Sequence, residues 1–170
     1  MDNDNDKIYN IKHPHYNGGG FLFKIIYYIC SMTLIEILLI IFIHWVADFI
    51  FQAEEWANNK SKNFKALVKH TAMYSFIWYL VGFGFAVYGN HFNGPSIEDL
   101  GWTSWMGLFP VITFVFHTLT DYITSKIVSR KFAKQEYGSP IPNFGAFTVI
   151  GFDQVLHYLQ LFLTYHFLTV

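Results

Sequence analysis

Three pairs of a histidine and an aspartate, each four residues apart, are the residues of this chain best suited to do chemistry. They are His44 and Asp48 in "HWVAD", His117 and Asp121 in "HTLTD", and Asp153 and His157 in "DQVLH". Residues four apart share one face of an α-helix and lie one turn apart. A fourth histidine, His70, stands in "KHTAMY". Because imidazoles and carboxylates suit zinc, manganese and iron, this pattern indicates a site for a divalent metal ion.

The same pairs have an interpretation without metal. Each aspartate could accept a hydrogen bond from the histidine four residues away on its own helix. An aspartate at mid-membrane costs about 2.5–3.5 kcal/mol on insertion scales, and such a bond would offset part of that cost. Hydrogen bonding within one helix does not explain why the His/Asp pair occurs on three segments, or why His70 is present. A metal centre is therefore preferred, with a proton relay and a structural polar core as the alternatives.

Long apolar segments must position these residues. Of the 170 residues, 53% are hydrophobic and only 14% are charged, whereas soluble domains average about 25% charged residues. No Asp, Glu, Lys or Arg occurs over 70–97, 100–120 or 154–170, and a membrane-crossing helix needs roughly 20 residues. We predict an all-α fold, a bundle of four transmembrane helices within 21–170, after a disordered polar tail over 1–20. The predicted helices are 21–52, 64–88, 104–127 and 144–168.

Lysine and arginine positions predict the orientation. Basic residues cluster in two segments: Lys60, Lys62, Lys65 and Lys69, and Lys126, Arg130, Lys131 and Lys134. Since cytoplasmic loops are enriched in Lys and Arg, we predict that loops 53–63 and 128–143 are cytoplasmic, in a multi-pass protein of the inner membrane. The acidic start, "MDNDND", does not fit a signal peptide, so the first helix is expected to be retained. A net charge of −1 gives no reason to expect nucleic acid as a partner.

Under this topology, the motif residues fall at one depth in the cytoplasmic leaflet, because a helix rises 1.5 Å per residue. Threonine and glutamine continue the polar stripes on the third and fourth helices, and polar stripes of membrane helices face the bundle. The predicted metal ligands are His44, Asp48, His70, His117, Asp121, Asp153 and His157. They suffice for one or two ions, with zinc favoured and manganese or iron as alternatives. The predicted catalytic residues are Asp48, Asp121 and Asp153.

Four segments together, "HWVADFIFQ", "KHTAMY", "HTLTD" and "FDQVLH", resemble a family of small polytopic membrane proteins of bacteria and phages. The family is catalogued as domain of unknown function 3307, and the resemblance covers about residues 35–165. It implies about four helices, motif residues that include Gln52 and Gln154 besides the histidines and aspartates, and no established reaction. The layout is more distantly similar to that of inner-membrane proteins described as metal-dependent hydrolases.

Three functions are compatible with these features. The favoured one is a metal-dependent hydrolase, in which a metal-bound water attacks a lipid or another phosphoester. Gln52 and Gln154 would orient ligands or substrate, and Lys69 and Lys126 would attract an anionic headgroup at the cytoplasmic mouth.

The two alternatives are transport and a non-catalytic role. A proton or metal-ion transporter would need polar groups that reach the outer face, for which Glu36, Thr164 and His166 are candidates. A non-catalytic phage membrane protein that acts on the host envelope would use the His/Asp pairs only to join helices. Membrane lipid is the expected partner in every case, and the sequence does not indicate an oligomeric state.

Overall fold

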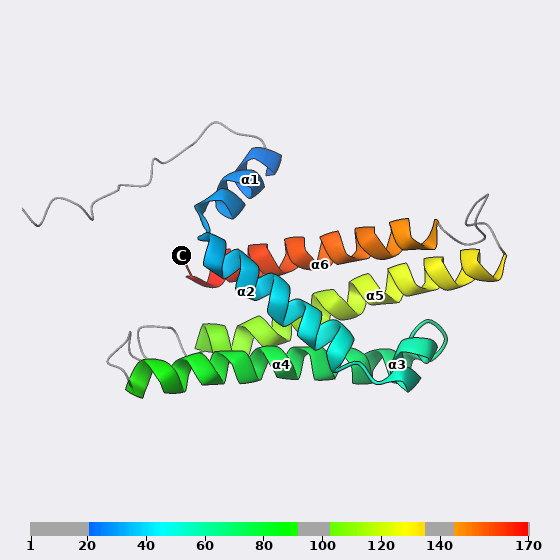
Figure 1. Cartoon of the computed structure of the whole chain (residues 1–170), viewed down its shortest axis with the longest axis horizontal. Helices are drawn as coiled ribbons and strands as arrows, with labels where there is room; N and C mark the ends of the chain where they lie inside the picture. The colour runs from blue at the N-terminus through cyan, green and yellow to red at the C-terminus, as the bar shows by residue number, and fades with distance from the viewer. Residues whose placement is uncertain (1–20, 92–102, 135–144, 170) are drawn as a thin grey trace, which may run out of the picture.

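The computed structural model describes residues 21–91, 103–134 and 145–169, and most of these residues are helical (Figure 1). No strand occurs among these residues, so the all-α prediction is confirmed. The predicted disordered tail and most of the predicted loop 128–143 lie outside the described residues. The helices are α1 (Phe21–Ser31), α2 (Leu34–Trp45), α3 (Glu54–Asn59), α4 (Phe64–His91), α5 (Phe109–Ala133) and α6 (Ala146–Thr169), with two π-helical segments, η2 (Val46–Ile50) and η3 (Thr103–Leu108).

Three long helices form the body of the molecule. α5 packs against both α4 and α6, and each neighbour runs antiparallel to it (Figure 1). α2 crosses this layer, contacting α6, and η2 continues it onto α4. The four predicted helical segments therefore all contribute to one bundle, with α3 as an additional short helix at one end.

The first predicted helix is not continuous, so the prediction of one helix over 21–52 is wrong. α1 ends at Ser31 and a new helix begins after Thr33, which has extended backbone angles (φ −71°, ψ 153°). The Thr33 side chain accepts from the Glu36 backbone N–H at 3.3 Å, and the Glu36 carboxylate accepts from the Thr33 backbone N–H at 2.7 Å. This reciprocal capping satisfies backbone donors at the helix start, so α2 can begin inside an apolar run. Glu36 also accepts a hydrogen bond from the Tyr165 hydroxyl.

The predicted boundaries at the basic end also need correction. α2 passes into the π-helix η2, which carries Asp48, and Gln52 lies beyond the last turn. The predicted loop 53–63 contains α3. α5 continues six residues past its predicted end at Ile127, to Ala133. Arg130 and Lys131 stand in its last turn, where cations interact favourably with the helix dipole.

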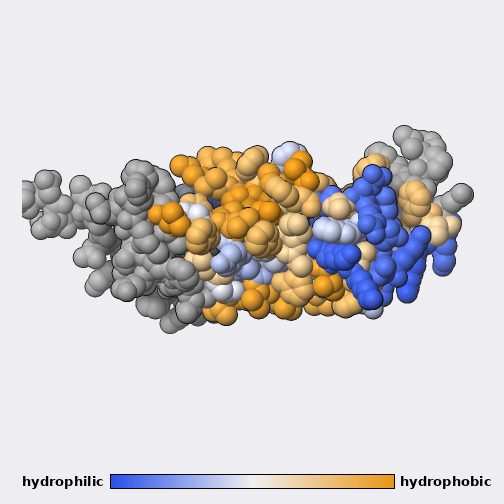
Figure 2. All heavy atoms as spheres, turned by 90° about the horizontal axis from the view of Figure 1, so that it is seen from below, coloured by the Kyte–Doolittle hydropathy of each residue, from blue (hydrophilic) through white to orange (hydrophobic). Residues whose placement is uncertain are grey.

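The interior of the described bundle contains a polar cluster beside a hydrophobic core, and much of its surface is apolar. Histidines, aspartates and threonines of α4, α5 and α6 are buried, while large side chains such as Ile35, Val111 and Phe152 are more than half exposed. Figure 2 shows hydrophobic residues over the middle of the molecule and hydrophilic ones gathered at the end where α3 lies. Among the described residues a single helix, Met106–Ala133, is long and apolar enough to cross a membrane, with a mean hydropathy of 1.3. One such helix does not by itself establish a multi-pass topology.

Candidate metal centre

His70 on α4 is the meeting point of the motif residues. Its Nε2 atom lies 3.1 Å from Asp48 Oδ1 on η2 and 3.1 Å from Asp121 Oδ2 on α5. The same atom is 3.2 Å from Nε2 of His117, also on α5. All four side chains are almost completely buried. Three structural elements therefore place two imidazoles and two carboxylates in mutual contact, and we call these four residues the quartet.

The spacing within the quartet matches that of ligands around one ion. His117 Nε2 lies 3.5 Å from Asp48 Oδ1 and 3.7 Å from Asp121 Oδ2. Five distances among the four donor atoms thus lie between 3.1 and 3.7 Å. Ligand atoms bound to a tetrahedral zinc ion at about 2.0–2.1 Å are about 3.3 Å apart. Buried groups that could hold a metal ion are Asp48 with His70 and His117, His117 with Asp121 and His157, and His44 with Asp48 and His157.

The pairs within single helices are not the ones in closest contact. The nearest nitrogen and oxygen atoms are 3.9 Å apart in His44–Asp48, 3.7 Å apart in His117–Asp121 and 3.6 Å apart in Asp153–His157. A side-chain separation of 3.6 Å is too long for a hydrogen bond. Hydrogen bonds between each aspartate and its own histidine are thus not what satisfies these carboxylates. Asp121 Oδ2 accepts from Lys60 instead, and Asp48 Oδ1 has no hydrogen-bond partner among the described residues.

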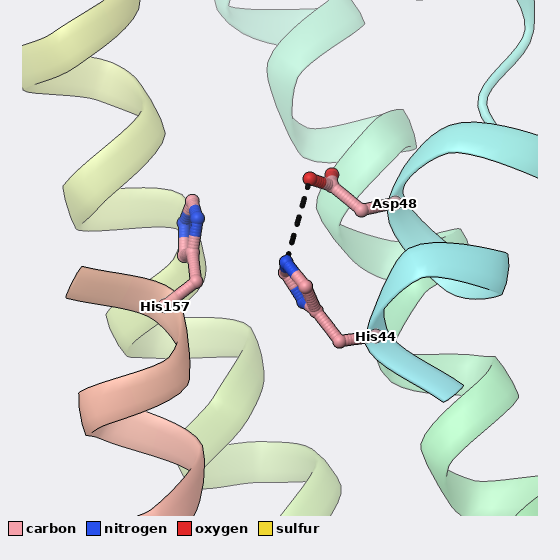
Figure 3. A group of neighbouring side chains, drawn as sticks. All are labelled: His44, Asp48 and His157. Atoms are coloured by element: carbon pink, nitrogen blue, oxygen red, sulfur yellow. Dashed lines mark ion pairs between the residues drawn. The ribbon is translucent and has the colours of Figure 1, made fainter. Parts of the chain in front are cut away.

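His157 lies beside the quartet. Its ring stacks on that of His117, with centroids 4.1 Å apart, and its Nε2 atom is 3.8 Å from Asp121 Oδ1. Neither ring nitrogen has a hydrogen-bond partner among the described residues, although the side chain is fully buried. Figure 3 shows His157 on α6 facing His44 and Asp48 across the bundle interior. A buried polar group left unpaired costs about 1–3 kcal/mol, so these nitrogens favour an additional binding partner.

His44, by contrast, has both ring nitrogens engaged. Carboxylates only accept hydrogen bonds, so the Gln154 Nε2 amide donates to Asp48 Oδ2 and Asp153 Oδ2, each at 3.3 Å. Gln154 Oε1 then accepts from His44 Nε2–H at 2.8 Å, and His44 Nδ1 accepts from the Tyr74 hydroxyl at 2.7 Å. Gln154 thus contacts the cluster, and its predicted role in orienting ligands or substrate stays a prediction. Tyr74 was not predicted, although it follows His70 by four residues and so shares its helix face.

Asp153 is held at the edge of the cluster. Its Oδ1 atom accepts a 2.6 Å hydrogen bond from Thr124 and its Oδ2 atom accepts from Gln154. Among the described residues it belongs to none of the three groups that could hold a metal ion. The predicted ligand and catalytic role of Asp153 stays a prediction, since two hydrogen-bond donors already satisfy it.

Lys60 joins the cluster and was not among the predicted site residues. Its ammonium donates to Asp121 Oδ2 at 2.9 Å, and its side chain is only 20% exposed. Burial alone lowers the pKa of Lys60, but the Asp121 and Asp48 carboxylates outweigh burial and hold that pKa above its ordinary value. Lys60 lies in the turn after α3, a helix that the sequence pattern did not indicate, so no spacing signal distinguished it from the other lysines.

Three other predicted residues lie away from the quartet. Lys69 is exposed on α4, and the Lys126 ammonium lies 3.5 Å above the Tyr122 ring. Gln52 is half-buried beyond η2, and within the described ranges no hydrogen bond joins it to the cluster. Among the described residues, no direct contact joins these three side chains to the quartet. Their predicted roles in orienting ligands or attracting substrate stay predictions.

In comparisons with known proteins, no family model, curated protein or solved structure matches the chain. The resemblance to domain of unknown function 3307 therefore stays a prediction. What the geometry establishes is a buried His/Asp cluster whose donor atoms could hold a metal ion.

Proposed function

We propose that this chain is a multi-pass protein of the inner membrane that binds a divalent metal ion at the quartet and hydrolyses a phosphoester of a lipid or lipid-linked substrate. The observation that carries the proposal is the set of five distances of 3.1–3.7 Å among donor atoms from η2, α4 and α5. Zinc is the first candidate, and manganese or iron are alternatives, because the donors are imidazole and carboxylate without thiolate.

The charge of the cluster supports a cation. With neutral imidazoles, the carboxylates of Asp48, Asp121 and Asp153 contribute three negative charges, and Lys60 offsets one of them. Two buried negative charges remain, and uncompensated buried charge is strongly destabilising. One divalent ion would neutralise them, and His157, whose ring nitrogens are unpaired and which belongs to two of the three groups that could hold a metal ion, would offer a further donor.

The residues around the quartet suit a hydrolytic reaction. A bound divalent ion supplies Lewis acidity and lowers the pKa of a coordinated water toward neutrality. Asp153, held in place by Thr124 and Gln154, is suited to accept the proton of that water. The Lys60 ammonium, hydrogen-bonded to Asp121 and partly open to solvent, is suited to attract the negative charge of a phosphoester. Gln154 and Tyr74 hold the His44 ring through both of its nitrogens.

Membrane insertion is supported by the distribution of side chains. Exposed surfaces of α2, α4, α5 and α6 carry large apolar residues, and charged side chains gather at one end of the bundle (Figure 2). Polar residues in membrane helices face the bundle interior, as the buried histidines and aspartates do here. The two basic segments lie at the same end of the molecule, as α3 and the C-terminal end of α5 do (Figure 1), which supports a shared cytoplasmic side.

Metal analysis tests the proposed ligand set. Protein purified in detergent after growth with added zinc, manganese or iron should contain about one ion per chain, measured by inductively coupled plasma mass spectrometry. His70→Ala and His117→Ala should remove that ion, because each deletes a quartet donor. His166→Ala, a histidine on α6 outside the cluster, should keep it. Wild-type protein without bound metal under all three conditions would contradict the proposal.

A hydrolysis assay separates an enzyme from the alternative functions. The metal-loaded protein should cleave the chromogenic diester bis(p-nitrophenyl) phosphate, and Asp121→Asn should abolish cleavage. A transporter would instead move ions into liposomes without cleaving the ester. Glu36, the predicted outward extension of a transport path, serves here as a helix cap and as the acceptor for Tyr165, which favours hydrolysis over transport.

A further inference from the structure

A groove opens beside the metal centre, between the turn that follows α3 and one face of α5. Its volume is about 650 Å³. The turn and the start of α4 contribute one wall, and α5 contributes the other. The lining residues of α5 that matter here, Phe114, Thr118, Tyr122 and Lys126, follow one another at intervals of four, so they form a continuous stripe on one helix face.

The two ends of the groove differ in chemistry. Lys60, Lys62 and Lys126 gather at the end near α3, whereas Phe114, Val115 and Leu119 line the other end. From Phe114 to Lys126 the helix axis rises about 18 Å. A cationic end and an apolar end at this separation match a molecule with an anionic head and an acyl chain. Val115 and Leu119 are about half exposed, so the apolar end is open on the side of α5 that carries other exposed apolar residues.

We infer that this groove binds an anionic phospholipid, with the headgroup phosphate at the three lysines and an acyl chain along Phe114, Val115 and Leu119. This inference rests on the proposed membrane location and names the substrate class of the proposed metal site. Phosphate is attracted by clustered lysines at a membrane surface. A free phosphate or a nucleotide would leave the apolar half of the groove without a partner, which is why a lipid is the occupant that fits.

Lys60 connects the groove to the quartet. Its side chain lines the groove, and its ammonium donates to Asp121 at 2.9 Å. A phosphate held by Lys60 would thus be separated from the proposed metal ligands by a single side chain. Lys60 is therefore a positioning residue, which links a phosphate in the groove to the buried cluster.

Native mass spectrometry of the detergent-solubilised full chain tests the inference. The protein is titrated with phosphatidylglycerol, with phosphatidylcholine and with inorganic phosphate. We expect phosphatidylglycerol to bind most tightly, and the double variant Lys62→Gln/Lys126→Gln to bind it roughly thirtyfold more weakly. The matched control is Lys131→Gln/Lys134→Gln, which removes the same charge from exposed positions outside the groove and should bind like wild type.

Three results would overturn the lipid site. They are equal binding of phosphatidylcholine and phosphatidylglycerol, an equal loss of binding in the two double variants, and binding of inorganic phosphate as tight as that of the lipid. Metal content is measured on the same samples. If wild-type protein contains its full metal complement but does not select phosphatidylglycerol, the lipid-binding groove is refuted and the metal centre is not. If the protein selects phosphatidylglycerol but contains no metal, only the proposed catalysis is refuted.

Discussion

His70 is the residue on which the geometry of the cluster depends most. It stands alone in its sequence segment, without an aspartate four residues away, yet its Nε2 atom touches both quartet carboxylates and His117. The three motif pairs could be identified from their spacing. The contacts between helices could not, because they depend on how α4 packs against η2 and α5. Lys60 was missed for the same reason: its contact with Asp121 spans 61 positions of the chain.

Substituting one aspartate at a time distinguishes a residue that binds the metal from a residue at the edge of the cluster. Asp48→Asn should abolish metal binding, since Asp48 Oδ1 contacts two quartet histidines. Asp153→Asn should weaken metal affinity only about 10- to 100-fold, as expected for a residue that acts through others. Isothermal titration with zinc measures both affinities. Equal losses in the two variants would show that Asp153 is itself a ligand.

Removing the Lys60 ammonium tests its role as a counter-charge. In metal-free protein, Lys60→Gln should lower the free energy of unfolding by about 1–3 kcal/mol, because the buried Asp121 carboxylate loses a charged donor. The loss should be smaller with metal bound, since the ion would then interact with Asp121. Thermal unfolding in detergent, with and without metal, measures the difference. Lys65→Gln, at an exposed lysine on α4, is the control and should unfold like wild type.

At the level of elements, two irregular features shape the first helical segment. The Thr33–Glu36 capping box starts α2 in the right place to reach α6, and the π-helix η2 directs Asp48 toward α4. The capping box has a sequence signature, a threonine followed three residues later by a glutamate, so it could have been recognised in "TLIE". The π-helix has no such sequence signature; π-helical turns are rare and occur frequently at functional sites. The ends of the long helices α4, α5 and α6 were predicted within a few residues, because their apolar runs are long. The exception is the C-terminal end of α5.

The capping box can be tested directly. Thr33→Ala removes the side-chain acceptor at the start of α2 and should lower the free energy of unfolding by about 1 kcal/mol. Thr33→Ser retains a hydroxyl and should restore most of that stability. Circular dichroism during thermal unfolding gives both values. No difference between alanine and serine would mean that the cap does not contribute to stability.

For the molecule as a whole, the buried polar cluster and the apolar exterior support the proposed location in a membrane. The candidate span Met106–Ala133 crosses the full length of the body, antiparallel to α4 and α6 (Figure 1). The basic turn after α3 and the basic end of α5 lie at one end of the molecule, whereas the start of α2 lies near the C-terminal end of α6 (Figure 1). This arrangement agrees with the proposed topology, in which both basic segments lie on one side of the membrane.

Cysteine labelling tests that topology. In a Cys30→Ser background, single cysteines at Lys62 and Lys131 should react with a membrane-impermeant maleimide only after cells are opened. A cysteine at Leu34, an exposed position, should react in intact spheroplasts. Labelling of positions 62 and 131 from opposite sides would contradict the proposed arrangement, as would labelling of all three positions from one side.

The central claim is that His70, His117, Asp48 and Asp121 bind one metal ion between them. The most direct measurement is anomalous diffraction from crystals of the full chain, with data collected above and below the zinc, manganese and iron absorption edges. The account predicts a single anomalous peak within about 2.0–2.2 Å of Nε2 of His70 and Nε2 of His117, bordered by both carboxylates. A map with no peak between α4, α5 and η2, or with a peak only at exposed surface residues, would contradict it.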